Sequence, residues 1–460
     1  MIHLIKKYAS GICLLFILGA CDSFVEVDLP NSQLTNTAVF ENYETANAAL
    51  MNIYAKMRDT GVLTGVNTGL SNELGNYTDE ITAYGTASNS SMPFYNNALL
   101  PTSTIIAGYW NSTYNQIYAA NALLEGIGNS KNLSAEDKKK LTGEALFIRA
   151  LAHFYLAGLF GDIPYIKTTD YRQNSAVVKT PINIVYENIS GDLQNAILLL
   201  SDNYSSNDRI RPNKLACRAL LARLFLYRKS YAEAANEASA VLNQTGTYSL
   251  ELDLDKTFLL ASKETIWQFQ SVSAGQNTKE GSIFIFQAGP PTTIALNPVL
   301  INSFSAGDLR RTNWIKAVSK GTSTWYHAFK YKEQNTTAVS KEYSIVFRLA
   351  EQYLIRAEAR AFQGDLIGAK EDLNKIRSRA GLGKTPASTK EEILEAVLQE
   401  RRWEFFTEHG HRFFDLKRFG RLDTELSSVK PGWTSTDSLL PIPQNELSTN
   451  PNLQPQNPGY

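Results

Sequence analysis

Apolar residues recur at every third or fourth position along most of the chain, and this spacing is typical of amphipathic α-helices. It predicts helices over residues 43–58 and 105–127, a longer helix that starts after Ser134 and ends at Gly161, and another over residues 180–200. The pattern therefore predicts a mostly α-helical protein.

Two of these helices carry start signals. Ser134 can cap the helix that follows it, with the side chain of Asp137 reaching back to the cap. Thr180 and Pro181 are typical of an N-cap followed by the first helical residue, a position where proline loses no hydrogen bond. We therefore expect helices to begin at these two places.

An internal repeat links two helical segments. The stretch LLARLFLYRKSYAEAANEASAVL at residues 220–242 has large and small apolar residues at the spacing of a tetratricopeptide unit, and the pattern recurs at residues 355–376. Antiparallel helices approach closely only where side chains are small, so alanines are expected at the crossings. Arg356 and Arg360 depart from the pattern by replacing apolar residues of the first unit. The repeat positions are Leu221, Ala222, Phe225, Ala234, Ala238 and Val241, and then Ala357, Ala369, Leu373 and Ile376.

Two long regions lack the helical spacing. Residues 61–104 and roughly 244–344 are rich in Gly, Ser, Thr, Asn and aromatic residues, with strand-like pieces at 265–269 and 283–286. Loops of this length are usually functional or disordered, and the aromatic content of these two argues against disorder. We therefore expect a tetratricopeptide-like helical-repeat scaffold with a loop-rich face that carries a few short strands.

The first residues have the pattern of a targeting segment. Lys6 and Lys7 precede an apolar run that is too short to span a membrane, and the run ends in LGAC at residues 18–21, which resembles the lipobox of bacterial lipoproteins. The resemblance implies that residues 1–20 are a signal peptide and that the Cys21 thiol carries a lipid, which would hold the protein at a bilayer. An ordinary secretory signal, in which Cys21 has no role, is the alternative.

The composition is that of a globular protein. Hydrophobic residues make up 43% of the chain and charged residues 20%, and Lys+Arg equals Asp+Glu at 45 each. This balance leaves no basic surplus of the kind that nucleic-acid binding requires. The chain has 3 cysteines, of which Cys13 and Cys21 lie in or next to the leader, so no disulfide framework is expected and Cys217 is predicted to be a small core residue.

The sequence offers few catalytic candidates. The segment EHGHRFFD contains Glu408, His409, His411 and Asp415, but in a helix the two histidines would point to different sides, so we expect no metal site there. The chain has no GxSxG, HExxH or CxxC motif. Paired carboxylates for glycoside hydrolysis stay open, because their separation depends on the three-dimensional structure. We assign no catalytic residue and expect no cofactor.

Five blocks in order resemble the SusD/RagB family of Bacteroidetes outer-membrane lipoproteins. They are CDSFVEVDLP, EALFIRALAHFYLAGLFGDIPY, RLAEQYLIRAEARA, ERRWEFFTEHGHRFFDLKRFG and LLPIPQNELSTNPNLQPQNPGY, and they run from Cys21 to Tyr460. The resemblance implies that residues 21–460 form a single SusD-like domain, in which four tetratricopeptide-like helix pairs support a loop-rich face. It also implies a lipid-anchored protein at the outer membrane and cell surface, held through Cys21.

The function that the resemblance implies is capture of nutrients without catalysis. Family members usually bind oligosaccharides and pass them to a SusC-like TonB-dependent transporter, for which they act as a lid. A peptide-binding lid of the same architecture is the first alternative, and a cryptic glycosidase is the second.

Two loop clusters have the composition of a sugar-binding surface. Sugars present apolar C–H faces and polar rims, so a surface that binds them needs aromatic rings with polar or charged groups beside them. The first cluster lies around GNYTDEITAYG and the second in DLRRTNWIKAVSKGTSTWYHAFKY. Trp325 is the foremost candidate because it follows a flexible polar stretch. For Arg310 and Trp314, the alternative to ligand binding is a role in the scaffold. Trp110 and Trp267 are predicted to be core residues. The candidate ligand-binding residues are Tyr77, Asp79, Tyr84, Tyr95, Arg310, Trp314, Trp325 and Tyr326.

Overall fold

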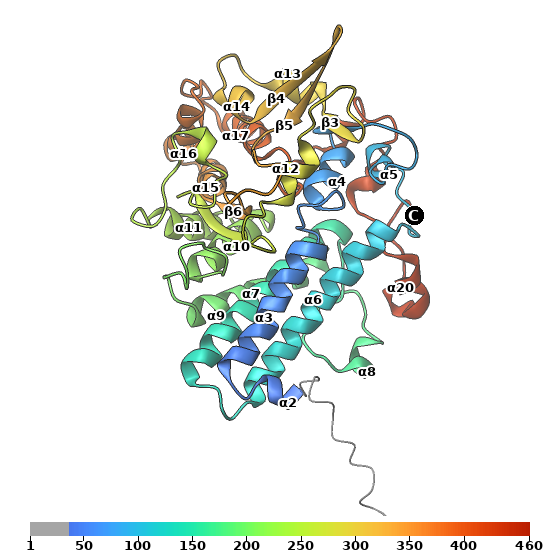
Figure 1. Cartoon of the computed structure of the whole chain (residues 1–460), viewed down its shortest axis with the longest axis vertical. Helices are drawn as coiled ribbons and strands as arrows, with labels where there is room; N and C mark the ends of the chain where they lie inside the picture. The colour runs from blue at the N-terminus through green and yellow to red at the C-terminus, as the bar shows by residue number, and fades with distance from the viewer. Residues whose placement is uncertain (1–35) are drawn as a thin grey trace, which may run out of the picture.

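The computed structural model describes residues 36–460, in which antiparallel helices form a scaffold with a loop-rich region at one end (Figure 1). The scaffold helices are α3 (Tyr43–Thr60), α6 (Thr104–Asn129), α7 (Ala135–Phe160), α9 (Ile182–Leu199), α10 (Lys214–Tyr227), α11 (Tyr231–Leu242), α15 (Leu349–Gln363), α16 (Leu366–Arg379) and α17 (Lys390–Phe405). Helix α3 packs against α6, α7 against α9, α10 against α11 and α15 against α16, while α17 covers α15 and α16. The predicted helical-repeat scaffold is confirmed.

The internal repeat lies in two of these helix pairs, α10–α11 and α15–α16. Ala234 and Ala369 are fully buried, and their small side chains let the neighbouring helices approach closely. The two arginines that depart from the pattern both pair with Asp372 of α16, Arg356 at 2.7 Å and Arg360 at 2.9 Å. Ion pairs therefore replace apolar contacts at this partly exposed edge of the second unit.

The start and the end of α7 agree with the sequence prediction. The Ser134 hydroxyl accepts a hydrogen bond from the Asp137 backbone N–H at 3.1 Å and donates one to the Asp137 carboxylate at 2.6 Å. Gly161 ends the helix with a φ of 78°, in the left-handed region that favours glycine. The predicted helix from Ser134 to Gly161 is confirmed.

The start of α9 differs from the prediction. Pro181, rather than Thr180, occupies the N-cap position, because Thr180 is paired with Ile163 in an isolated β-bridge. The cap comes from outside the helix, since the Asp162 carboxylate accepts a hydrogen bond from the backbone N–H of Ile182 at 2.8 Å. The sequence therefore placed the helix correctly but misassigned its cap.

The loop-rich region contains short strands that pair in antiparallel fashion, β1 with β3, β2 with β6, and β4 with β5. The β4–β5 hairpin projects from the molecule at the top of Figure 1. Strand β2 confirms the strand predicted at 265–269. The strands are β1 (Ile81–Ala83), β2 (Thr265–Phe269), β3 (Ile294–Leu296), β4 (Ile315–Lys320), β5 (Ser323–Ala328) and β6 (Ser344–Arg348).

The strand predicted at residues 283–286 is wrong, because most of that run belongs to helix α12 (Lys279–Phe284) and its C-cap. Phe284 and Ile285 are both buried, whereas successive side chains of a half-buried strand would alternate between buried and exposed. A short apolar run does not distinguish the two structures by its periodicity. The other short helices and 3-10 turns are α2 (Asn36–Val39), α4 (Leu70–Tyr77), α5 (Met92–Tyr95), α8 (Tyr171–Asn174), α13 (Pro298–Ser303), α14 (Leu309–Asn313), α18 (His411–Phe419), α19 (Leu422–Leu426), α20 (Gln444–Thr449), η1 (Leu254–Lys256), η2 (Ser435–Ser438) and η3 (Pro451–Leu453).

Apolar side chains form a large core within the scaffold and a smaller one beneath β1, β3 and the β4–β5 hairpin. Trp110, Trp267 and Cys217 are buried in the scaffold core, as predicted, and burial raises the pKa of the Cys217 thiol. Among the described helices, α7 is long and apolar enough to cross a membrane, and its apolar part is wholly buried inside the molecule.

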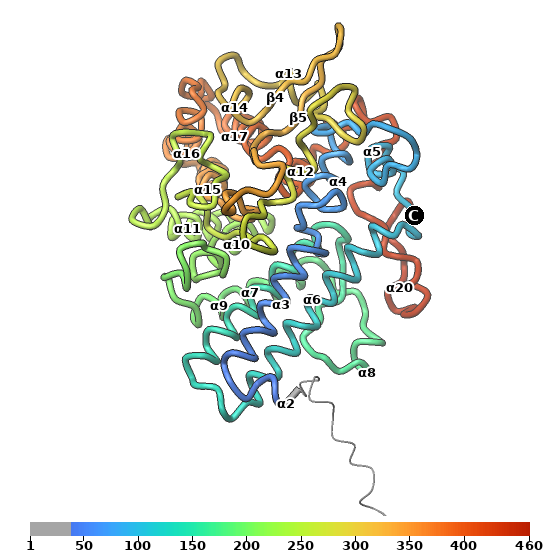
Figure 2. The backbone as a smooth tube through the Cα atoms, in the orientation of Figure 1, coloured from blue at the N-terminus to red at the C-terminus, as the bar shows by residue number. Residues whose placement is uncertain are grey.

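The C-terminal segment returns to the first half of the chain, as the backbone trace shows in red (Figure 2). The backbone N–H of Leu440 donates to the Leu159 carbonyl at 2.9 Å, and that of Gln444 donates to the Pro101 carbonyl at 2.9 Å. The C-terminal block therefore packs against the end of α7 and the residues just before α6, although both lie in the first half of the chain.

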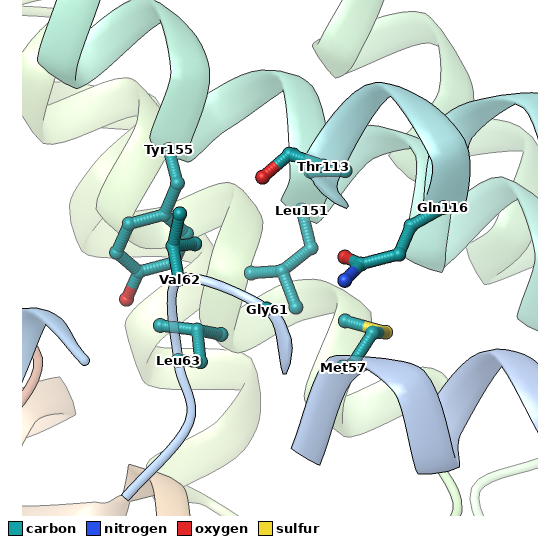
Figure 3. Close-up of a pocket in the computed structure, with 9 residues that line it drawn as sticks. Met57, Gly61, Val62, Leu63, Thr113, Gln116, Leu151 and Tyr155 are labelled. Carbon is teal, nitrogen blue, oxygen red and sulfur yellow. The ribbon is translucent and has the colours of Figure 1, made fainter. Parts of the chain in front are cut away.

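A small cavity lies inside the scaffold between α3, α6 and α7 (Figure 3). Thr113 and Gln116 lie against it beside the turn at Gly61, and their Oγ1 and Nε2 atoms lack a hydrogen-bond partner among the described residues. The space is comparable to a water molecule. It is far too small for an oligosaccharide, so the candidate site must lie elsewhere.

Candidate functional site

Two loops that are far apart in the sequence are joined beside the short β1–β3 pair. Tyr84 follows β1, and its backbone N–H donates to the Thr293 carbonyl at 2.7 Å. The Asn89 side-chain amide donates to the carbonyls of both Tyr84 and Thr293, at 2.8 and 2.9 Å. These bonds hold the loop after Tyr84 against the segment before β3.

A third segment, strand β5, brings Trp325 to these two joined loops. Trp325 is half-buried and lies directly on Gly289, where a Cβ atom would stand only 2.3 Å from the indole ring. Partial burial and the nearby Tyr95 hydroxyl raise the pKa of Tyr84, and a hydrogen-bonding contact with Trp325 opposes that rise. Tyr84, Tyr95 and Trp325 therefore lie together, and we call these three half-buried residues the aromatic platform.

Tyr95 is supported from below by a buried lysine. The Lys430 ammonium lies 4.1 Å from the centre of the Tyr95 ring and donates to the Asn76 carbonyl at 2.6 Å. Burial lowers the pKa of Lys430 to about 7, although the negative charge of Asp79 opposes the change. The cation and the ring form a cation–π contact that fixes one side of the aromatic platform.

Tyr326 lies on the opposite face of the hairpin from Trp325, because successive strand residues point to opposite sides. Its ring packs against the smaller core and carries the Arg311 guanidinium at 4.6 Å from its centre. The structure therefore does not bring Tyr326 to the aromatic platform.

Four of the predicted site residues are buried and require a correction. Tyr77 and Trp314 are 0% exposed, and the Trp314 indole donates to the Leu254 carbonyl at 3.0 Å. The Tyr77 hydroxyl donates to the Asp437 carbonyl at 3.2 Å. Both rings are packed in the protein interior, so neither offers a face to a ligand, and we assign both to the scaffold.

The other two buried residues, Asp79 and Arg310, are charged, and both form buried ion pairs. Asp79 binds Arg412 at 2.9 Å and Arg402 at 2.7 Å, and although burial opposes ionisation, these two arginines lower its pKa. Arg310 binds Asp308 at 2.8 Å and Glu404 at 3.0 Å and is 0% exposed. Their charges are neutralised within the protein, so both residues also belong to the scaffold.

Sequence reasoning missed several residues next to the platform. Gly289 supports the Trp325 ring, and Lys430 supports the Tyr95 ring. His327 lies two positions after Trp325 on the same face of β5, with Phe286 at a ring distance of 5.2 Å. The period of two along the strand could have found His327, whereas nothing in the local sequence signals Gly289 or Lys430.

The candidate metal ligands in EHGHRFFD serve other purposes. Asp415 binds Arg401 at 2.7 Å, and His409 contacts the Ile345 carbonyl at 2.9 Å. Glu408 pairs with Arg348 at 2.8 Å. Within residues 36–460, no group of three or more His, Cys, Asp or Glu side chains could hold a metal ion. The segment is part of the framework beneath the loops.

Comparisons with known proteins agree with the helical-repeat fold. Residues 25–226 match a family model described as "Starch-binding associating with outer membrane", and residues 302–460 match one described as "SusD family". The chain belongs to the SusD family.

Individual relatives support the assignment. The chain is 28% identical to SusD-like protein P2 of Formosa agariphila, over 77% of this chain and 81% of that protein. A shorter stretch, 25% of this chain and 21% of the relative, is 38% identical to the starch-binding protein SusD of Bacteroides thetaiotaomicron.

Solved structures share the fold. A SusD superfamily protein of Bacteroides vulgatus superimposes with a TM-score of 0.80 at 22% identity, over 92% of this chain and 100% of the other. A laminarin-binding SusD-like protein superimposes with a TM-score of 0.78 at 24% identity, over 92% of this chain and 100% of the other.

Proposed function

We propose that this protein binds oligosaccharides on the aromatic platform and does no chemistry on them. The observation that carries the proposal is the convergence of Tyr84, just after β1, Tyr95, at the end of α5, and Trp325, in β5. Half-buried rings held in place by Gly289 and Lys430 are suited to stacking against the apolar faces of sugars. The starch-binding and laminarin-binding proteins among its relatives support this class of ligand.

The same proposal includes the place where the protein works. Residues 21–460 would act as one unit, anchored to the outer membrane at the cell surface through a lipid on Cys21, which lies outside the described residues. The bound oligosaccharide would pass to a SusC-like TonB-dependent transporter, with this protein as its lid. The outer-membrane association in the description of the family model supports the location. Copurification of such a transporter with the membrane-extracted protein tests the partnership.

Replacing Trp325 with alanine tests the ligand surface. We expect Trp325→Ala to weaken oligosaccharide binding by about 1–3 kcal/mol, the usual effect of removing an aromatic anchor, in calorimetric titrations against a glycan panel. The melting temperature should hardly change, because the ring is only half-buried.

The control is Tyr118→Ala, which removes a ring that is 52% exposed on α6, away from the platform. It should leave oligosaccharide affinity unchanged. Equal affinity of the Trp325→Ala variant and the unaltered protein would contradict the platform. Binding of peptides but of no glycan would instead favour the peptide-binding alternative.

A further inference from the structure

The segments that build the platform contain no carboxylate. Residues 81–124 and 281–307 contain no Asp, Glu, Lys or Arg, although the chain has 45 acidic and 45 basic residues in 460. Residues 309–332, which include the β4–β5 hairpin, contain six basic residues and no Asp or Glu. In a chain with equal numbers of acidic and basic residues, these three stretches therefore contribute no carboxylate to the platform, and their only formal charges are positive.

Three of the six basic residues are already used inside the protein. Arg310 and Lys330 are buried, where Arg310 binds Glu404 and Lys330 binds Glu408. Lys332 pairs with Asp255 at the base of the hairpin. The other three are Arg311, Lys316 and Lys320, and within residues 36–460 none of them lies in an ion pair. Arg311 and Lys316 lie over the rings of Tyr326 and Phe329, and Lys316 also helps to lower the pKa of Asp255, but none of the three cations has a carboxylate of the described residues within ion-pair distance.

Two of these three cations, Lys316 and Lys320, lie on the same face of the hairpin as Trp325. Strand register places Val318 opposite Trp325, with Lys316 and Lys320 two residues to either side of Val318. Side chains opposite each other on paired strands share a face, and diagonal neighbours stand about 7–8 Å apart. Both lysines are exposed. The Lys316 ammonium lies 5.3 Å from the centre of the Phe329 ring, and rotation of this exposed side chain brings it towards a ligand that stacks on Trp325.

We propose that the ligand of this site is an acidic oligosaccharide, whose carboxylate or sulfate groups bind Lys316 and Lys320 while a sugar ring stacks on Trp325. The proposal rests on the proposed function and names the class of its ligand. Lysines also protect exposed strand edges from aggregation, but that role does not account for the missing carboxylates in all three segments. Unmatched positive charge attracts an anionic ligand and gives no advantage to a neutral one.

The test compares sugars that differ only in charge. The purified full-length protein is titrated in detergent with an oligogalacturonate, a mannuronate oligosaccharide and a sulfated galactan oligosaccharide, each beside its carboxyl-reduced or desulfated neutral counterpart. We expect at least one acidic member to bind about 10-fold more tightly than its counterpart, with a preference that shrinks as NaCl is added.

A matched pair of double variants assigns the effect to the hairpin. Lys316→Met with Lys320→Met should weaken binding of the acidic sugar about 10-fold and of its neutral counterpart about 2-fold or less. The control, Lys131→Met with Lys139→Met, removes the same charge from exposed positions before and within the start of α7 and should change neither affinity. A loss of similar size in the control would overturn the role of the two hairpin lysines.

The outcomes separate this inference from the function on which it rests. Equal affinity within every pair, or tighter binding of the neutral members, overturns the acidic ligand and leaves oligosaccharide binding intact. Binding of poly-glutamate without any sugar overturns both in favour of an acidic peptide. Binding of none of these sugars overturns the acidic ligand, and the glycan panel used for the Trp325→Ala variant then decides whether the proposed function stands.

Discussion

Trp325 occupies its position because residue 289 has no side chain. A Cβ atom on Gly289 would lie 2.3 Å from one carbon of the indole ring and 2.5 Å from another, closer than any real contact. The glycine therefore decides where the largest ring of the platform lies. This contact joins residues 36 positions apart in the sequence, which is why local sequence patterns cannot find it.

Gly289→Ala should move the Trp325 ring and weaken ligand binding. We expect an affinity loss of about 1 kcal/mol, within the range for partial loss of an aromatic anchor, together with a shift of tryptophan fluorescence. Calorimetric titration and emission spectra measure the two effects. Gly246→Ala is the control, because that glycine is exposed and a Cβ there would meet nothing within 4 Å. Unchanged affinity of Gly289→Ala would show that the ring tolerates displacement.

At the scale of elements, the repeat helices were predictable because their pattern is local. Helix α7 is specified by signals within its own sequence. These are apolar residues at every third or fourth position, the Ser134 cap at its start and Gly161 at its end. The same reasoning failed at residues 283–286, where a short apolar run suits a strand and a helix equally. Half of the predicted site residues proved buried, because an aromatic or charged residue in a loop-rich region can equally belong to a second core.

The close approach of α10, α11 and α15 depends on small residues. Ala234→Leu, at a fully buried position of α11, should destabilise the protein by about 1–3 kcal/mol, because the added carbons force the helices apart. Urea unfolding measures the change. Ala232→Leu inserts the same side chain at an exposed position of the same helix and should change stability by less than about 0.5 kcal/mol. Similar losses in both variants would mean that helix propensity, not packing, controls this element.

For the whole molecule, one buried carboxylate connects the loop-rich region to the scaffold. Glu404 near the end of α17 binds Arg310 at the base of the β4–β5 hairpin, Arg348 at the end of β6 and Arg379 at the end of α16. Burial opposes its ionisation, but Arg379, Arg348 and Arg310 hold the pKa of Glu404 well below its usual range. Glu404 thus joins the hairpin base, the strand and the repeat helices in one buried network of ion pairs. Each of the three arginines has a further carboxylate partner in this network, Asp308 for Arg310, Glu408 for Arg348 and Glu264 for Arg379.

The pH dependence of this contribution has a definite sign. A carboxylate whose pKa is lower in the folded state than in the unfolded chain stabilises the fold fully above the unfolded value, here about 4.5, and the stabilisation is lost as the pH falls. We therefore expect Glu404→Gln to lower the free energy of unfolding by about 3 kcal/mol at neutral pH, since it removes one carboxylate partner from each of three buried guanidinium groups. The deficit should shrink towards acidic pH.

Glu395 on the same helix separates this effect from a general loss of charge. Its carboxylate is 59% exposed on the side chain and pairs with Arg421 at 2.9 Å, so Glu395→Gln should lower the free energy of unfolding by less than about 1 kcal/mol at every pH. Urea unfolding of both variants between acidic and neutral pH measures the difference. If Glu404→Gln lost no more stability than Glu395→Gln, the loop-rich region would be held to the scaffold by its apolar contacts, and the hairpin would not depend on the buried charge.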